Sequence, residues 1–118
     1  MRENVVSPAV RLVFGQAEGF VLWLNPVGFD HEKKIRYGLQ VGSSDLIGMA
    51  PGGLFLAVET KGTKTVTTDE QLRYLQLVYD RGGVACRIGK SIKTPEAATA
   101  AAQEMVRGIR AGIRRHGW

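Results

Sequence analysis

The feature that constrains this chain most is an apolar segment that passes directly into a charged one, at residues 54–61 (LFLAVETK). Its unbroken apolar run follows a Pro51-Gly52-Gly53 turn and is typical of a strand that is buried on both faces. The segment therefore predicts a central strand of a sheet. Glu59 and Lys61 stand two residues apart, so both side chains point to the same face of that strand. Burying either charge without a partner costs several kcal/mol, so we expect a compensating group nearby.

The rest of the chain predicts a mixed α/β fold in which helices flank the sheet. Amphipathic spacing predicts helices at 3–16, between the Thr-rich stretch 63–68 and Gly82-Gly83, and at 95–115. Pro8 opposes the first helix, which we expect to start near Ser7 or to break there. Short runs of β-forming residues predict strands at 20–24, 54–61 and 84–91, a turn followed by a strand within 39–49, and a polar loop or mobile hairpin at 25–38.

The two later helices carry clear terminal signals. Thr67 with Glu70, and Thr68 with Gln71, both fit a capping box at the start of the middle helix. Thr94 is expected to cap the last helix, with Pro95 in its first position. The predicted buried sides comprise Leu72, Leu75, Val78 and Tyr79 in the middle helix, and Ala98, Ala102, Met105, Ile109 and Ile113 in the last.

Length and composition narrow the class of protein. With 118 residues, the chain is expected to form a single domain over residues 1–118. No apolar run approaches the roughly 20 residues of a membrane-spanning helix, and residues 1–19 lack the order of a secretory signal, so we expect a cytoplasmic protein. One cysteine, Cys86, excludes an internal disulfide, and with only His31 and His116 beside it a structural zinc site is unexpected. The net charge of +5 leans weakly towards a polyanionic partner.

A third charged residue is positioned to join the pair in the central strand. Asp45 follows a Gly42-Ser43-Ser44 turn and is the only other acid in this middle segment before the helix. Its turn would bring it beside the adjoining strand, next to Glu59 and Lys61. Two converging carboxylates suit a hard cation such as Mg²⁺, which activates water and polarises a phosphoryl oxygen. An adjacent lysine adds charge stabilisation, so these residues predict phosphodiester hydrolysis.

This D-x13-E-T-K arrangement resembles the PD-(D/E)XK nuclease superfamily, and more narrowly the VRR-NUC (virus-type replication-repair nuclease) family. The resemblance covers about residues 1–93 and rests on four landmarks in order. These are Gly42-Ser43-Ser44-Asp45-Leu46-Ile47-Gly48, the run from Pro51-Gly52-Gly53 through Phe55 to Val58-Glu59-Thr60-Lys61-Gly62, Gln71 with Tyr74-Leu75, and Gly82-Gly83-Val84-Ala85. One departure is Ser44, which replaces the proline usual before the aspartate.

The resemblance implies a restriction-endonuclease-like fold and a Mg²⁺- or Mn²⁺-dependent DNA endonuclease, of a kind linked to four-way (Holliday) junctions and, in some members, to homodimers. It implies that Asp45 and Glu59 are metal ligands, together with the main-chain carbonyl of Thr60 and, more weakly, Glu3 in the first helix. Lys61 is implied as the catalytic lysine and Gln71 as a helix residue that faces the site. The apolar side of the first or last helix is the expected dimer interface.

Several basic residues are candidates for DNA contact. Lys33, Lys34 and Arg36 lie in the polar segment before the Asp45 turn, and Lys64 follows the central strand. In the last helix Arg107, Arg110 and Arg114 share one face, either to track a phosphate backbone or to complement the helix dipole. Trp23 is expected in the core.

Two other functions are consistent with the same residues. One is a non-catalytic nucleic-acid-binding module that keeps the fold and the basic surface. The other is a small interaction or assembly protein whose charge is incidental. The complete set of Asp45, Glu59 and Lys61 favours the nuclease, because a pure binding module has no need of it.

Overall fold

A computed structural model describes residues 3–40, 42–61, 67–89 and 91–118, with side chains from Val6 onward. Lys64 and Gly62 lie outside the described residues, and Glu3 is described as backbone only. The elements in chain order are α1 (Glu3–Gln16), β1 (Val21–Leu24), β2 (Gly28–Asp30), β3 (Ile35–Tyr37), β4 (Leu46–Ala50), a 3₁₀ turn (Pro51–Gly53), β5 (Leu54–Thr60), α2 (Asp69–Asp80), β6 (Val84–Ile88), α3 (Pro95–Arg110) and β7 (Arg115–His116).

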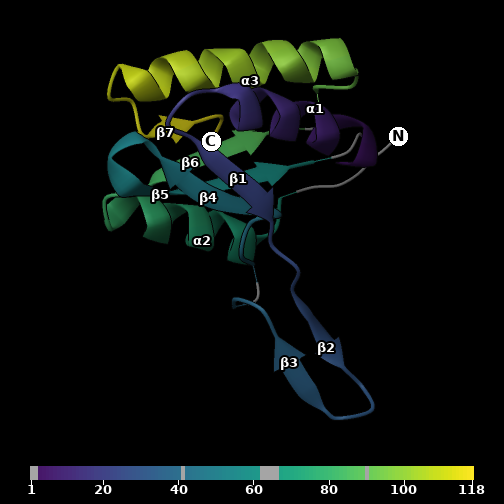
Figure 1. Cartoon of the computed structure of the whole chain (residues 1–118). Coiled ribbons are helices and arrows are strands. Elements are labelled where there is room, and N and C mark those ends of the chain that lie inside the picture. Colours follow the sequence, from purple (N-terminus) through teal and green to yellow (C-terminus); the bar gives the residue numbers. More distant parts are fainter. Residues whose placement is uncertain (1–2, 41, 62–66, 90) are drawn as a thin grey trace.

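Five strands form one mixed sheet in the order β1-β4-β5-β6-β7 (Figure 1). The pairs β1–β4 and β4–β5 are antiparallel, whereas β5–β6 and β6–β7 are parallel. The other two strands form a separate hairpin, β2–β3, which projects from the body beyond the end of the sheet (Figure 1). The predicted α/β class is therefore confirmed, and of the two alternatives for residues 25–38 the structure adopts the hairpin.

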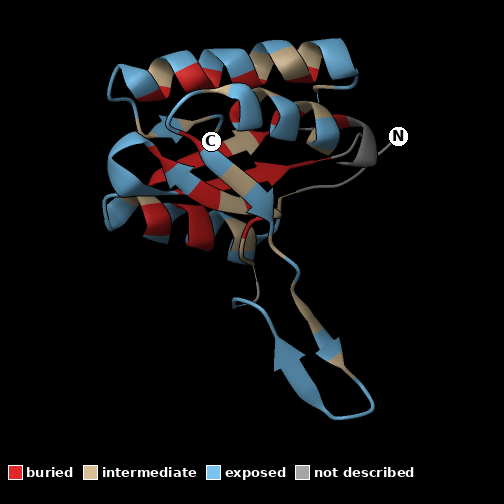
Figure 2. Cartoon of the chain, in the orientation of Figure 1, coloured by how far each residue is buried: buried red, intermediate tan, exposed pale blue. Residues whose placement is uncertain are grey.

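Helices cover the two faces of the sheet unequally (Figures 1 and 2). Helices α1 and α3 pack against each other and together cover one face, where Val10, Phe14, Leu56 and Val58 are fully buried. Helix α2 lies on the opposite face and packs chiefly against β5 and β6. The apolar sides of α1 and α3 thus line the core, and the expectation that one of them forms a dimer interface stays a prediction.

Strand β5 occupies the centre of the sheet, as its apolar run predicts. From Leu56 to Lys61 every residue is buried, including both charged ones. Leu54 and Phe55 are exposed, because they lie at the start of the strand, where neither face is covered. The charged end of the strand is therefore its most enclosed part.

Helix α1 runs through Pro8 without a break, contrary to the predicted start or interruption near Ser7. Pro8 lies close to the start of the helix, so it removes a single hydrogen bond in the second turn. Val6, Val10 and Phe14 are buried along one stripe on either side of it. Burial of these side chains, worth about 1.5–3 kcal/mol each, outweighs the cost of the proline.

Helix α2 begins with one of the two predicted capping boxes. The hydroxyl of Thr68 accepts from the N–H of Gln71 at 3.1 Å, and the Gln71 side chain accepts from the N–H of Thr68 at 2.9 Å. Leu75 and Val78 are buried as predicted, but Leu72 is exposed. It stands beyond the edge of the narrow stripe that contacts β5 and β6.

Helix α3 ends at Arg110, so its predicted extent of 95–115 is wrong. Gly112 adopts a φ of 92°, a left-handed conformation that ends the helix and turns the chain back. The following residues form β7 beside β6, and Ile113, predicted to be buried, is 52% exposed. Arg114 lies outside the helix and donates to the carbonyls of Tyr79 and Gly83, so it shares no helical face with Arg107 and Arg110.

Trp23 is not a core residue. It is 43% exposed, because it lies on the same sheet face as α2 but at the β1 edge, which α2 does not cover, whereas its neighbour Leu22 packs into the α1–α3 side. Cys86 is fully buried in β6, as expected, and burial raises the pKa of its thiol. Among the described residues, no helix combines the length and apolar character needed to cross a membrane.

Candidate metal centre

The antiparallel pairing of β4 and β5 brings the two predicted carboxylates together. Leu46 pairs with Val58, so the next position of the same ladder places Asp45 opposite Glu59. Residues that pair directly across an antiparallel ladder present their side chains on the same face. The spacing of 14 residues in the sequence is therefore the distance along the chain between two residues that face each other on neighbouring strands.

Asp45 and Glu59 hold each other through the backbone. The N–H of Asp45 donates to Oε1 of Glu59 at 3.2 Å. In the other direction, Oδ2 of Asp45 accepts from the N–H of Thr60 at 3.3 Å and from its hydroxyl at 3.1 Å. Each carboxylate is thus oriented by the strand that carries the other.

Lys61 completes the group at the end of β5. Its ammonium lies 2.9 Å from Oε2 of Glu59, and among the described residues no other hydrogen-bond donor reaches that oxygen. Both residues are enclosed, since Glu59 is 1% and Lys61 5% exposed. Glu59 and Lys61 therefore neutralise each other's charge inside the protein, which offsets the cost of burying either one alone.

The pKa of Glu59 rises from 4.5 to about 7. Burial is the largest cause, because it disfavours the charged form, and repulsion from Asp45 adds to it. The hydrogen bond and charge of Lys61 act in the opposite direction but do not restore the ordinary value. A perturbed carboxyl beside a second carboxyl and a lysine is the electrostatic pattern typical of a functional site.

The turn that carries Asp45 is fixed by residues that the sequence did not single out for this role. The side chain of Asn25 donates to the hydroxyl of Ser43 at 3.0 Å and to the carbonyl of Ser44 at 2.8 Å. The N–H of Asn25 also donates to the carbonyl of Asp45 at 2.8 Å. Ser44, which stands where the resembled family has proline, is buried and donates to the carbonyl of Leu46.

Gln71 stands close to this turn, but its side chain is already engaged. A Cβ on Gly42 would lie 2.6 Å from the carbonyl of Glu70, so the turn lies against the first turn of α2. Burial raises the pKa of the Tyr74 hydroxyl on α2, and the Ser44 side chain of the turn partly opposes this rise. The Gln71 carbonyl oxygen, however, accepts from Thr68 within the capping box. The structure places Gln71 beside the site as a capping residue.

Arg87 is a basic neighbour of the site that the sequence analysis missed. It pairs in register with Glu59 across the parallel β5–β6 ladder, so the two side chains leave the sheet on the same face. Its guanidinium donates to the hydroxyl of Thr67 at 2.6 Å and to the carbonyl of Gly117 at 3.1 Å. An arginine within an otherwise apolar strand was the signal available in the sequence.

The donors present fit a hard divalent cation. No group of three His, Cys, Asp or Glu side chains forms within the described ranges, so the protein ligands available there are two carboxylates and main-chain oxygens. The carbonyl of Thr60 leaves the strand on the same side as its N–H, which faces Asp45. Two repelling carboxylates, one with a raised pKa, are the groups whose mutual repulsion a divalent cation relieves. Asp45, Glu59 and this carbonyl would hold Mg²⁺, which keeps waters in its other positions.

The other predicted site residues are not seen in contact with Asp45, Glu59 and Lys61. Lys33, Lys34 and Arg36 are all exposed on the β2–β3 hairpin, outside the cluster around Asp45. The side chain of Asp30 orders the hairpin tip by accepting from the N–H groups of Glu32 and Lys33. The positions of Glu3 and Lys64 relative to the site stay predictions, because the Glu3 side chain and the whole of Lys64 lie outside the described part.

The sequence was also compared with known proteins. It matches no protein-family model and no curated protein sequence.

Proposed function

We propose that this protein is a metal-dependent DNA endonuclease with a restriction-endonuclease-like arrangement of its sheet, acting on branched DNA such as four-way junctions. The observation that carries the proposal is the cluster of Asp45, Glu59 and Lys61 at the enclosed end of β5. The resemblance to the PD-(D/E)XK and VRR-NUC nucleases names the same three residues. It also supplies the substrate class, which the cluster alone does not specify.

The chain's own groups suit the chemistry of phosphodiester hydrolysis. Asp45 and Glu59 would bind Mg²⁺ or Mn²⁺ with the Thr60 carbonyl, and the bound ion would lower the pKa of a water and neutralise phosphate charge. Thr60 holds the Asp45 carboxylate in place through two hydrogen bonds. Lys61 places a positive charge where negative charge develops on the phosphate oxygens during in-line displacement.

Further basic groups would hold the nucleic acid. Arg87 lies on the same face of the sheet as Glu59, and the hairpin carries Lys33, Lys34 and Arg36 in solvent. Phosphate contacts from such residues position a duplex without reading its sequence. This arrangement accords with a nuclease that selects DNA by its shape.

A cleavage assay tests the proposal directly. A labelled four-way junction is incubated with the protein and Mg²⁺, with EDTA in a parallel reaction. Cleavage is expected only with the metal, and it should vanish in Glu59→Ala. Glu104→Ala is the matched control, since Glu104 is an exposed acid paired with Arg107 on α3. Equal cleavage by wild type and Glu59→Ala would refute the site.

The alternative is a non-catalytic nucleic-acid-binding module. One observation favours this module: Lys61 and Glu59 form an ion pair, and both side chains are almost fully buried. Such a pair can also serve only the stability of the fold. A junction that is shifted in a gel but left intact with Mg²⁺, Mn²⁺ and Ca²⁺ would support this module over the nuclease. Binding that is absent or insensitive to salt would argue against both.

A further inference from the structure

An uncovered part of the sheet lies directly beside the candidate metal centre. On the face that carries Asp45 and Glu59, the next cross-strand row contains Trp23 of β1 and Ile47 of β4. Ile47 stands two residues from Asp45 on the same strand, so the two rows are about 7 Å apart. Trp23 is 43% exposed. An exposed indole ring therefore lies one row away from the residues expected to hold the metal.

The apolar surface continues along the sheet, away from the metal centre. Val21, Met49 and Phe55 form the third row, and each is between 41% and 45% exposed. Leu77 of α2 lines a hollow together with Phe55 and is 38% exposed. An exposed apolar area that extends over three strands and a helix is typical of a binding surface. We call it the apolar sheet face; it comprises Val21, Trp23, Ile47, Met49, Phe55 and Leu77.

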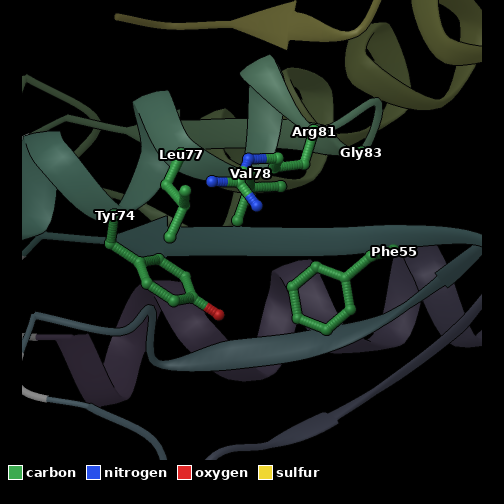
Figure 3. A pocket seen from close by; sticks show the side chains of 6 residues that line it. All are labelled: Phe55, Tyr74, Leu77, Val78, Arg81 and Gly83. Carbon is green, nitrogen blue, oxygen red and sulfur yellow. The ribbon is translucent and has the colours of Figure 1, made fainter.

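Basic side chains border this face on the side of α2. Phe55, Tyr74 and Arg81 are among the residues that line a hollow of about 260 Å³ between β5 and α2 (Figure 3). A second hollow of about 190 Å³ shares Tyr74 and Leu77 with the first, and Arg73 contributes to its lining. Both arginines are exposed, and within the described part of the chain Arg81 makes no ion pair. Positive charge is therefore available along the margin of an apolar, partly aromatic surface.

We propose that the unpaired bases of a DNA strand stack on the apolar sheet face, with Trp23 contacting the base closest to the metal centre and Arg73 and Arg81 contacting phosphates. Stacking here deepens the proposed function and rests on it, since that function supplies DNA as the ligand. Surfaces that bind single strands combine aromatic rings with basic groups, because each nucleotide offers a base to stack on and a phosphate to neutralise. Trp23 and Phe55 supply the exposed rings of this combination.

The same features select unpaired DNA over other occupants. Bases inside a duplex are stacked on one another, so their faces are closed to protein side chains unless the base is extruded. A protein partner would cover the apolar residues equally well, but it would have no general need of arginines at the margin. The strand that enters the metal centre is therefore expected to be unpaired where it passes Trp23.

Tryptophan fluorescence of the full chain tests the stacking directly. The probes are an oligothymidylate of about 20 nucleotides, long enough to span a single-strand site, and a duplex of the same length. Both are titrated in EDTA, so that binding is measured without metal-dependent cleavage. Oligothymidylate should quench the emission, and Trp23→Phe should remove the quenching, because only Trp118 then emits. Binding without quenching, or equal quenching in Trp23→Phe, would overturn the proposal.

Affinities for the same probes measure what the stacked base contributes. Trp23→Ala should weaken oligothymidylate binding at least about fivefold, as expected for the loss of one stacked base, and leave duplex binding unchanged. Leu24→Ala is the matched control, because Leu24 follows Trp23 in β1, is 53% exposed and points to the opposite face of the sheet. Equal weakening by the two variants, or none by Trp23→Ala, would contradict the stacking. If neither probe binds, the proposal fails and a protein partner becomes the better occupant.

Salt dependence tests the arginines at the margin. Arg81→Gln should lower the slope of log K against log salt by about 0.7 for oligothymidylate, which corresponds to one lost phosphate contact on a single strand. Arg107→Gln, on α3 and across the sheet from α2, should leave this slope unchanged. An unaltered slope in Arg81→Gln would remove this arginine from the binding surface.

Cleavage assays separate a failure of this inference from a failure of the proposed function. With Mg²⁺, wild type should cleave a junction that has an unpaired stretch at its branch point faster than the fully paired junction, and Trp23→Ala should lose this preference. Mg²⁺-dependent cleavage without quenching by oligothymidylate would refute the stacking alone. Quenching that depends on Trp23, without cleavage in any metal, would support the stacking and refute the nuclease.

Discussion

The N–H of Asp45 donates to Oε1 of Glu59 at 3.2 Å, while Oδ2 of Asp45 accepts from the residue that follows Glu59 in β5. The two acids are therefore held together by their own backbones, although their charges repel. A protein that needed only a stable sheet would gain from replacing either acid, because the repulsion is a cost to folding. This cost is the reason to expect that the pair serves a bound cation.

Asp45→Asn should weaken the binding of Mg²⁺ by roughly tenfold or more, because it removes one of the two anionic ligands. The amide keeps an oxygen that can accept from Thr60, so the turn should remain folded. Isothermal titration calorimetry of the full chain measures the affinity. Asp80→Asn is the control, since Asp80 lies at the far end of α2, where it accepts from Gln76. Unchanged affinity in Asp45→Asn would remove this residue from the metal site.

The raised pKa of Glu59 predicts how stability depends on pH. Below about pH 4.5 the carboxyl is protonated in both the folded and the unfolded chain, so it contributes no pH dependence. Between about pH 4.5 and 7 the folded chain retains a proton that the unfolded chain has released. The free energy of unfolding therefore falls across this window, by about 1–3 kcal/mol, and levels off above it.

Urea denaturation from pH 4 to pH 8 checks this dependence by comparing wild type with Glu59→Gln. The variant lacks the titrating group, so the difference between the two free energies should change across the window and be constant outside it. Mg²⁺ should raise the wild-type Tm more at pH 8 than at pH 5, because it binds the ionised carboxylate. Parallel profiles for the two proteins would contradict the pKa assigned to Glu59.

Lys61→Ala should abolish cleavage while leaving the fold and most of the DNA binding intact. The ammonium contacts Glu59 and not the core, and its loss lets the buried Glu59 stay protonated, which limits the effect on stability. Junction cleavage, gel shift and circular dichroism measured together separate these outcomes. Lys93→Ala serves as control, since Lys93 is exposed before α3. Turnover at the wild-type rate in Lys61→Ala would exclude a catalytic lysine at this position.

That Asp45, Glu59 and Lys61 lie together could be predicted from the sequence, because it depends on a single pairing of two neighbouring strands. The apolar run before Glu59 identifies a central strand, and the spacing of 14 from Asp45 to Glu59 matches the turn that links β4 to β5. Alternation along the strand then places Glu59 and Lys61 on one face. Arg87 was missed, because its place beside Glu59 depends on which strand pairs in parallel with β5, and local patterns do not contain that information.

The errors in the fold share one physical cause. Trp23, Leu72 and Ile113 are large and apolar, and each was assigned to the core on that ground. All three are exposed. Helix α2 is too short and narrow to cover Trp23 or to bury Leu72, and α3 ends at Arg110, before it reaches Ile113. The break expected at Pro8 failed for the same reason, since packing along α1 outweighs the local cost of the proline.

Gln71 offers a test of whether a residue near the site does more than cap a helix. Thr68→Ala and Gln71→Ala remove opposite halves of one capping box, so each should cost about 1 kcal/mol of stability. If Gln71 acts only as a cap, both variants should reduce cleavage to the same small extent. A much larger loss of kcat in Gln71→Ala at equal stability would assign it a role at the metal centre. Chemical denaturation and cleavage rates of the two variants make the comparison.

Replacing Lys33, Lys34 and Arg36 together with glutamine should weaken DNA binding without altering the chemistry of cleavage. These residues are exposed on the hairpin and make no ion pair among the described residues, so their charges are available to phosphates. Each lost phosphate contact should reduce the slope of log K against log salt by about 0.9. The matched control replaces Arg107 and Arg110, which lie on α3 across the sheet from α2, with glutamine. Titrations of a labelled junction at several salt concentrations measure the slope. If the α3 variant lowers the slope and the hairpin variant does not, DNA binds the opposite side of the molecule, away from the hairpin.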